Sequence, residues 1–293
     1  MTSRIEDAVP RLMPDEFRLL RELIYEHAGL RFDDDARVLF ERRLADRLSS
    51  TGVADYGAYY KYLRFSALGP AEVEEAVERL TTKETYFLRQ GYQLRAFEQE
   101  LLPRLAQASA QSKRLFVWSA GCSTGEEAYT LAILIHRSRL FENHEVRVIG
   151  SDISKTAIAR ARRGIYRPPS FRAVPRAFID AYFHTTSEGV QVIEEIRRLC
   201  HFGQLNLLDA GLVPLVGRVD VVFCRNVLIY FDAESRRRVI DAFYERLLPG
   251  GYLLLGHSES LLNVTTAFEL VHLSDDLVYR KPLAAERWDG PVG

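Results

Sequence analysis

The chain has 293 residues, of which 47% are hydrophobic and 27% are charged. This length and apolar content suffice for a large core and a smaller second domain. The formal net charge of −1 provides no overall field that would favour nucleic acid or an anionic membrane. No apolar run reaches the roughly 18 residues of a membrane span, and the amino terminus lacks a secretion signal, so we expect a cytoplasmic protein.

The first part of the chain has the apolar spacing of helices. This spacing predicts a helix from Pro14 to Gly29, another over 35–48, a third over 56–65 and a fourth that begins near Pro70. Gly29 is expected to end the first helix, because glycine readily adopts the left-handed conformation that closes helices. We therefore predict an all-helical amino-terminal domain over residues 1–85.

Four arginines gather on the second predicted helix: Arg37, Arg42, Arg43 and Arg47. Arg43 and Arg47 stand one helical turn apart, and the apolar positions of the same helix would face the core. A charged helical face is commonly only solvated. The alternative is that these arginines dock on an acidic partner.

Residues 86–114 are predicted to form a linker helix, after which strands and helices alternate. Such alternation indicates a largely parallel sheet with right-handed crossovers over residues 115–285. The predicted strands are 115–119, 146–151, 201–205, 219–224 and 252–256, with a last antiparallel pair at 268–273 and 278–280. The predicted helices between them are 125–138, 155–163 and 234–247.

Two segments depart from this alternation. Between residues 164 and 200, the apolar pairs around Phe183 and Val190 flank a polar turn, which predicts a small antiparallel β insertion. Residues 286–293 are expected to form a flexible tail.

A glycine loop joins the first predicted strand to its helix, with the sequence Ser-Ala-Gly-Cys-Ser-Thr-Gly-Glu-Glu over residues 119–127. A strand, a glycine turn and a helix start form a cradle for a nucleotide-like cofactor. Glu126 and Glu127 would repel the phosphates of a dinucleotide but suit an ammonium or sulfonium group, such as that of S-adenosylmethionine. Thr124 and Glu127 match a capping box, which leaves Glu126 as the carboxylate expected to reach the cofactor.

Polar residues also follow two other predicted strands. Asp152 follows the second strand, where a carboxylate can accept hydrogen bonds from ribose hydroxyls. The alternative is a turn aspartate that caps the next helix, although Ser154 is better placed for that cap. Arg225 and Asn226 follow the strand 219–224. An arginine there could hold a carboxylate acceptor, or could be a surface arginine at a strand end. Methyl transfer to an ionised carboxylate needs no strong general base, and the sequence shows no obvious catalytic dyad.

The three cysteines, Cys122, Cys200 and Cys224, are odd in number and widely separated. This pattern argues against a disulfide framework and a thiolate metal site, and the seven histidines lack metal-ligand spacing. We expect no metal. Cys122 and Cys224 are interpreted as small buried residues and not as nucleophiles.

Five motifs in order resemble those of the chemotaxis receptor methyltransferases of the CheR type, which methylate glutamates on the helical cytoplasmic domain of chemoreceptors. They are TTKETYFLR at 81–89, SAGCSTGEE at 119–127, NLL at 206–208, CRNVLIYF at 224–231 and GHSE at 256–259. The resemblance covers nearly the whole chain. Lys83 departs from the asparagine of the family signature, and Ala128 stands where many relatives have proline.

The resemblance implies an α/β fold: a Rossmann-like, S-adenosylmethionine-dependent methyltransferase sheet with a small antiparallel β insertion, preceded by an all-helical domain. It also implies S-adenosylmethionine as cofactor, S-adenosylhomocysteine as product, and a monomer. The implied cofactor-binding residues are Thr85, Arg89, Glu126, Asp152, Asn206, Leu207, Asn226 and Val227. The candidate catalytic residues are Arg225 and Tyr230.

The leading hypothesis is a protein-glutamate O-methyltransferase whose arginines at 37–47 meet the acidic helices of a chemoreceptor. Lys83 motivates a second hypothesis, a signalling module that binds S-adenosylmethionine or its product without transferring methyl groups. Action on amines or nucleic-acid bases is disfavoured by Arg225 and by the neutral net charge. In some relatives the β insertion binds a receptor tail peptide, but the loop at 184–189 is short, so we do not extend that binding to this chain.

Overall fold

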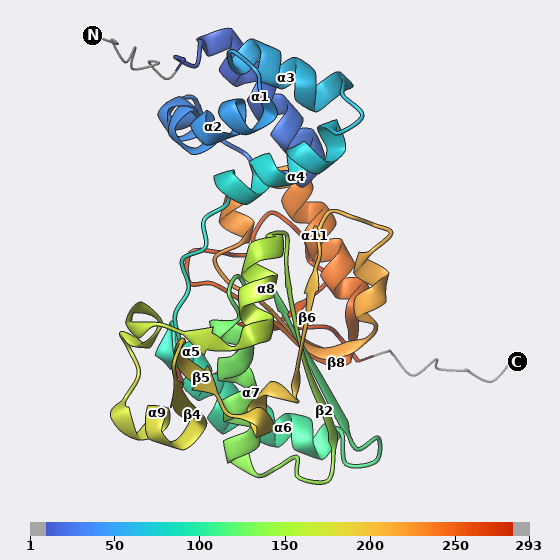
Figure 1. Ribbon diagram of the computed structural model, residues 1–293. Helices are drawn as coiled ribbons and strands as arrows, with labels where there is room; N and C mark the ends of the chain where they lie inside the picture. The colour runs from blue at the N-terminus through green and yellow to red at the C-terminus, as the bar shows by residue number, and fades with distance from the viewer. Residues whose placement is uncertain (1–9, 284–293) are drawn as a thin grey trace, which may run out of the picture. The chain divides into compact units, whose positions relative to one another are not determined.

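The computed structural model describes residues 10–283, which divide into two compact units (Figure 1). The first unit comprises the chain up to Thr82 together with Tyr230–Asp232, and the second comprises Lys83–Ile229 and the chain from Ala233 onward. The first unit therefore ends at Thr82, where the sequence predicted residue 85. The predicted tail at 286–293 lies outside the described residues.

The first unit contains the four predicted helices, α1 (Pro14–Ala28), α2 (Arg37–Thr51), α3 (Tyr56–Phe65) and α4 (Gly69–Leu80). Gly29 follows α1 with φ 66°, the left-handed conformation that its position predicted. Phe40 of α2 lies at the centre of the core, where its ring makes edge contacts with Phe17 and Phe32 at centroid distances of 5.1 and 4.9 Å.

The second unit is built on a seven-stranded sheet. Its strands, in spatial order, are β6 (Cys200–Gln204), β2 (Glu145–Asp152), β1 (Arg114–Ala120), β7 (Val219–Cys224), β8 (Leu247–Leu255), β10 (Leu277–Arg280) and β9 (Glu269–His272). The first five strands are parallel, and β10 runs antiparallel to both β8 and β9. The predicted antiparallel pair at the sheet edge is confirmed.

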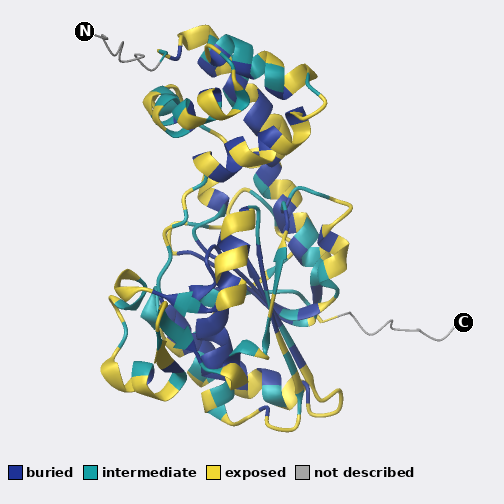
Figure 2. Cartoon of the chain, viewed as in Figure 1, coloured by how far each residue is buried: buried dark blue, intermediate teal, exposed yellow. Residues whose placement is uncertain are grey.

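Helices cover both faces of this sheet, as a parallel sheet requires. On β1, Val117 packs in the core formed with α7 (Glu126–Ser138), while the neighbouring Trp118 contacts Phe243 of α11 (Ala233–Arg246) at 5.1 Å between ring centroids. Figure 2 shows α7 almost wholly buried, whereas α8 (Lys155–Arg163) exposes one side.

The segment 86–114 is part of this core and not a linker. It forms α5 (Gly91–Ala96), a π-helical turn (Phe97–Leu101) and α6 (Leu102–Ala108), and the side chains of Phe87, Leu94 and Phe97 are buried in the main cluster. The predicted helix 234–247 also ends one residue early, because Leu247 already pairs with Val219 and opens β8.

The predicted β insertion forms a three-stranded antiparallel sheet, in the order β3 (Ile165–Tyr166), β5 (Gly189–Val192) and β4 (Phe183–Thr186). The short strand β3 was not predicted. A 3₁₀ turn (Pro168–Phe171), α9 (Arg176–Tyr182) and α10 (Glu194–Arg197) complete the insertion.

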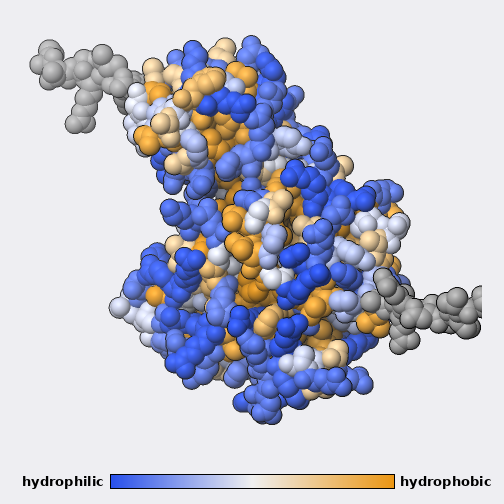
Figure 3. Space-filling view, turned by 90° about the vertical axis from the view of Figure 1, so that its right-hand side faces the viewer, coloured by the Kyte–Doolittle hydropathy of each residue, from blue (hydrophilic) through white to orange (hydrophobic). Residues whose placement is uncertain are grey.

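The face in Figure 3 is mainly hydrophilic, and hydrophobic residues form smaller areas within it. Within residues 10–283, no helix combines the length and the apolar character that a membrane crossing demands.

Candidate active site

The glycine loop lies at the carboxyl edge of the sheet, beside the loop that follows β2. The backbone N–H groups of Gly121 and Cys122 both donate to the carbonyl of Ser151, at 2.8 and 2.9 Å. A Cβ added to Gly121 would lie 2.4 Å from a methyl group of Val227, so only glycine allows the loop after β7 to approach this closely. The structure thus brings the second and fourth of the five motifs, 119–127 and 224–231, into close approach.

Strained backbone is concentrated around this edge. Leu88, Gln90, Ser123 and Asn226 all have positive φ, between 49° and 61°, which non-glycine residues rarely adopt. Such conformations persist only where surrounding contacts hold them, and they are frequent at functional sites.

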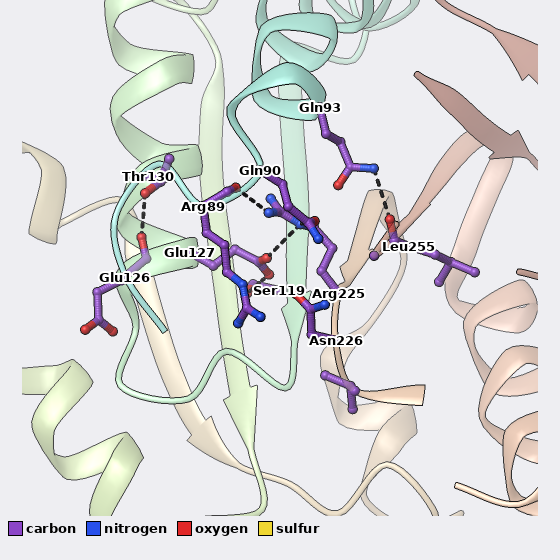
Figure 4. A network of polar contacts seen from close by, with 12 residues as sticks. Arg89, Gln90, Gln93, Ser119, Glu126, Glu127, Thr130, Arg225, Asn226 and Leu255 are labelled. Carbon is purple, nitrogen blue, oxygen red and sulfur yellow. Dashed lines mark hydrogen bonds and ion pairs between the residues drawn. The ribbon is translucent and has the colours of Figure 1, made fainter. Parts of the chain in front are cut away.

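Glu127 and Glu126 point in different directions, and the capping-box prediction for Glu127 is wrong. Gly125 precedes α7 with φ 94°, and no side chain caps the helix. The Glu127 carboxylate accepts a hydrogen bond from Ser119 Oγ at 2.7 Å and lies 3.5 Å from Arg225 Nε. Figure 4 shows this side chain directed toward Arg225, with Glu126 on the other side of the helix start.

Glu126 lies instead between two hydroxyl groups and is only 2% exposed. Its carboxylate accepts hydrogen bonds from Thr124 at 2.6 Å and Ser170 at 2.9 Å. Burial raises the pKa of both carboxyls, and Arg225 opposes this shift at Glu127. Successive helical residues diverge by about 100°, so two adjacent glutamates could not both face the same group. The sequence held no signal for which of them faces the sheet edge.

Arg225 is buried and paired, which differs from the predicted role as a holder of the acceptor. Its side chain is 2% exposed. Its Nε donates to Gln90 Oε1 at 3.0 Å, its Nη2 donates to the carbonyl of Arg89, and Glu127 lies beside it (Figure 4). Burial lowers the pKa of Arg225, and Glu127 counteracts that effect. Arg225 therefore positions Glu127 and the segment around Gln90.

One carboxylate, that of Glu259, holds the loop after β7. Glu259 Oε2 accepts the N–H groups of Asn226 and Gly256 at 2.8 and 2.7 Å, and Oε1 accepts those of Val227 and Ile229 at 2.9 and 3.3 Å. These bonds fix Asn226 at φ 61°. The sequence placed Glu259 in a family motif but assigned it no role; an acidic residue just after a predicted central strand was the available signal.

Asp152 and the turn at 206–208 lie next to each other after β2 and β6. Asp152 accepts the N–H groups of Ser123 at 2.8 Å and Ser154 at 2.9 Å, so it also orders the turn, as the alternative interpretation held. The predicted cap by Ser154 is confirmed, since its hydroxyl accepts from the Ala157 N–H. Asn206 Oδ1 accepts from Leu208 N–H, and the Leu205 N–H donates to the Asp152 carbonyl. Leu207, between Asn206 and Leu208 in the sequence, is buried.

The segment 83–90 passes beside the glycine loop. The carbonyl of Lys83 accepts from Ser123 Oγ at 3.3 Å, and Lys83 Nζ contacts Thr156 Oγ1 at 3.3 Å. Arg89 donates to the carbonyl of Glu84. Thr85 is partly exposed on the same segment.

The arginines of α2 have mostly internal partners. Arg47 forms a bidentate pair with Glu72 at 2.8 and 2.6 Å, and Tyr59 also donates to this carboxylate. Burial by itself would raise the pKa of Glu72, but hydrogen bonds from Arg47 and Tyr59 together outweigh it and hold the pKa below its usual value.

Arg43 donates to the carbonyls of residues 79–81 and caps α4, while Arg37 donates to the Leu12 carbonyl. Arg43 and Arg47 are thus engaged within the helical unit, only Arg42 of the four is exposed, and the docking role of these arginines stays a prediction. Tyr230 belongs to the helical unit, where its carbonyl accepts from the Arg31 N–H, and its place in the active site stays a prediction.

Burial raises the pKa of the Cys122 and Cys224 thiols well above the usual value, which keeps both neutral. Their interpretation as small buried residues is confirmed. In the part of the chain that the structure describes, no three His, Cys, Asp or Glu side chains are arranged to hold a metal ion.

Comparison with known proteins assigns both units. The family model for the CheR methyltransferase SAM-binding domain matches residues 83–276, and that for the CheR all-alpha domain matches 15–81, in agreement with the boundary at Thr82. Chemotaxis protein methyltransferase 2 of Vibrio cholerae is 35% identical over 270 residues, covering 91% of this chain and 93% of that protein. The chemotaxis protein methyltransferase of Escherichia coli is 34% identical over 259 residues, or 87% of each chain. The chain therefore belongs to the CheR family of S-adenosylmethionine-dependent chemotaxis protein methyltransferases.

Proposed function

We propose that this protein transfers the methyl group of S-adenosylmethionine to glutamate side chains in the cytoplasmic domain of chemoreceptors, forming glutamyl methyl esters and S-adenosylhomocysteine. The observation that carries the proposal is the cluster of Glu127, Arg225 and Asn226 at the carboxyl edge of a CheR-family sheet. We infer further that the protein acts in the cytoplasm as a monomer.

The residues at this edge fit the cofactor. Glu127 supplies a buried carboxylate for the cofactor's ammonium group, a role that the sequence had assigned to Glu126. Arg89 and Thr85 are proposed to face the amino-acid end, and Asp152 the ribose. The remaining proposed contacts, to the adenine and the reaction centre, come from Asn206, Leu207, Asn226 and Val227.

S-adenosylmethionine, when bound, supplies a methyl group on a positively charged sulfur. A glutamate acceptor is already ionised at neutral pH, so an oxygen–methyl bond can form as the sulfur–methyl bond breaks, and no proton needs to move. The work of this chain is alignment and exclusion of water. Glu259 fixes the loop after β7, Arg225 fixes Glu127, and Tyr230 is proposed as a wall of the site.

Receptor docking on the helical unit is proposed to rest on Arg42, the exposed arginine of the four, whereas Arg37 is half-buried and bonded to the Leu12 carbonyl. Residues 10–82 carry 11 basic and 14 acidic side chains. Because the unit has no positive excess, its attraction to an acidic receptor would be local and would not come from its net charge.

The test is methylation of a purified chemoreceptor cytoplasmic domain with methyl-labelled cofactor. We expect base-labile label on the receptor, and a receptor whose candidate glutamates are replaced by glutamine serves as the control. Binding of S-adenosylhomocysteine without any methyl ester would favour the non-catalytic alternative. If Lys83 is what prevents transfer in that case, Lys83→Asn should restore it. The contact of Lys83 Nζ with Thr156, at the start of α8, argues against an inhibitory role of Lys83.

A further inference from the structure

A strongly basic tract lies in the second unit, between Asp152 and Asp180. Residues 153–179 contain seven cations and no Asp or Glu, in a chain that has 39 basic and 40 acidic residues overall. The seven are Lys155, Arg160, Arg162, Arg163, Arg167, Arg172 and Arg176. All seven are exposed, and only three of them have a carboxylate partner, so the basic tract places an excess of positive charge on the surface.

The basic tract begins and passes beside the candidate site. It starts at the carboxyl end of β2, follows α8 and β3, and reaches the 3₁₀ turn at Pro168–Phe171 before α9 (Figure 1). Ser170 in that turn donates to Glu126 and accepts from the Phe87 N–H. Figure 2 shows the outward side of α8 as exposed. Lys155 at the start of α8 and Arg172 after the 3₁₀ turn therefore lie next to the loops of the sheet edge, and the other cations continue from there along α8, β3 and α9.

Arg172 extends this charge to the segment 83–90. Its guanidinium lies 3.8 Å from the centroid of the Tyr86 ring and pairs with Glu84 at 2.8 Å. Arg89 lies over the same ring at 5.8 Å. Two arginines thus flank one aromatic side chain on the segment that carries the proposed cofactor contacts.

The cations of the basic tract are available to a partner. Arg163, Arg172 and Arg176 pair with exposed carboxylates, and such surface pairs contribute little and exchange readily. Within residues 10–283, Arg160 and Arg167 form neither an ion pair nor a side-chain hydrogen bond, although the charge of Arg160 acts through space on Glu126, where it opposes the rise in pKa that burial causes. Their role in holding the fold is correspondingly small.

We propose that the basic tract is a docking surface for an acidic helical face of the methyl-accepting protein. The inference rests on the proposed function, because an acceptor methylated on several glutamates presents negative charge along its helices. Positive charge at the border of the site attracts that face and raises the local concentration of acceptor carboxylates. The basic tract belongs to the methyltransferase unit, whereas the arginines of α2 belong to the helical unit.

The test compares three double variants in methylation of a chemoreceptor cytoplasmic domain at low and at physiological salt. Arg160→Glu/Arg167→Glu should raise the KM for the receptor at least about fivefold at low salt and flatten its salt dependence. Its kcat and its affinity for S-adenosylhomocysteine should stay unchanged. Arg104→Glu/Arg139→Glu carries the same change in net charge on exposed arginines of other elements and should leave KM unchanged. Arg160→Lys/Arg167→Lys should behave like the wild type.

Equal KM values for the two charge-reversed proteins would overturn the inference, as would a loss confined to kcat. The wild type could instead sediment tightly with phosphatidylglycerol vesicles, and Arg160→Glu/Arg167→Glu could lose this binding while its receptor KM stays unchanged. That pair of results would assign the basic tract to a membrane surface. A wild type that methylates no receptor refutes the proposed function itself, a result distinct from these.

Discussion

Replacing Glu259 with alanine should release the loop that carries Asn226. The substitution removes one carboxylate and leaves four backbone N–H donors without their acceptor. A buried donor without a partner costs about 1–3 kcal/mol, but three of these bonds are only partly buried and the one from Ile229 is exposed, so water can satisfy some of the donors. We therefore expect the free energy that holds this loop in its ordered conformation to fall by about 2–3 kcal/mol. This corresponds to roughly a 30- to 150-fold change in the equilibrium between the ordered and the released loop.

Two assays locate this loss. Amide hydrogen exchange should accelerate at Asn226, Val227 and Gly256, because their protection comes from the Glu259 carboxylate. Isothermal titration should show S-adenosylhomocysteine affinity reduced at least about tenfold, since Asn226 is no longer held at φ 61°.

Glu269→Ala is the matched control. Glu269 is an exposed glutamate of β9 that pairs with Arg280, and such a pair is worth about 0–1 kcal/mol. Equal exchange rates at Asn226 and equal cofactor affinity in the Glu259 and Glu269 variants would refute the reasoning, because the four bonds would then have no energetic weight.

Three other predictions concern the two carboxylates of α7 and the core of the helical unit. Glu127→Gln should weaken S-adenosylhomocysteine binding, measured by titration, by at least about tenfold, and Glu126→Gln by much less; the reverse order would restore the original assignment. Arg47→Ala should lower the unfolding free energy of the helical unit by about 3–5 kcal/mol, because it leaves the Glu72 carboxylate unpaired, whereas Arg42→Ala should change it by less than about 0.5 kcal/mol in thermal denaturation. The lowered pKa of Glu72 contributes stability that is present above the ordinary glutamate pKa and is lost as pH falls through the folded pKa, so wild-type melting should drop in acid more steeply than that of Glu72→Gln; parallel curves would contradict this.

Periodicity in the sequence determined the principal strands and helices, but it missed β3, α9 and α10 and began β8 at residue 252 instead of 247. The strand at Val219–Cys224 and the helix at Lys155–Arg163 were predicted to the residue, because each has a strong apolar pattern and a clear boundary signal. The segment 86–114 was recognised as helical but misplaced as a linker. Its apolar residues, such as Phe97, indicate a buried face, but the sequence does not identify the core cluster of the second unit as the surface that this face packs against.

In the active-site loops, too, the sequence predicted some features and left others to the tertiary structure. Glycine spacing and strand order placed Gly121, Asp152 and Asn226 at one sheet edge, since the carboxyl ends of parallel strands meet there. Which charged groups pair across that edge depends on contacts between residues far apart in the chain. Arg225 and Gln90 are 135 positions apart, and the pattern around either residue contains no trace of the other.

The sequence by itself therefore determined the family, the cofactor class and the order of strands and helices, because these depend on local periodicity and on motifs of fixed spacing. Only the tertiary structure decided that Glu127 and not Glu126 faces Arg225, that Arg43 and Arg47 stabilise the helical unit, and that Glu259 holds the loop after β7. The physical reason is that the direction of a charged side chain is set by the partner that compensates its burial, and that partner is supplied by the fold.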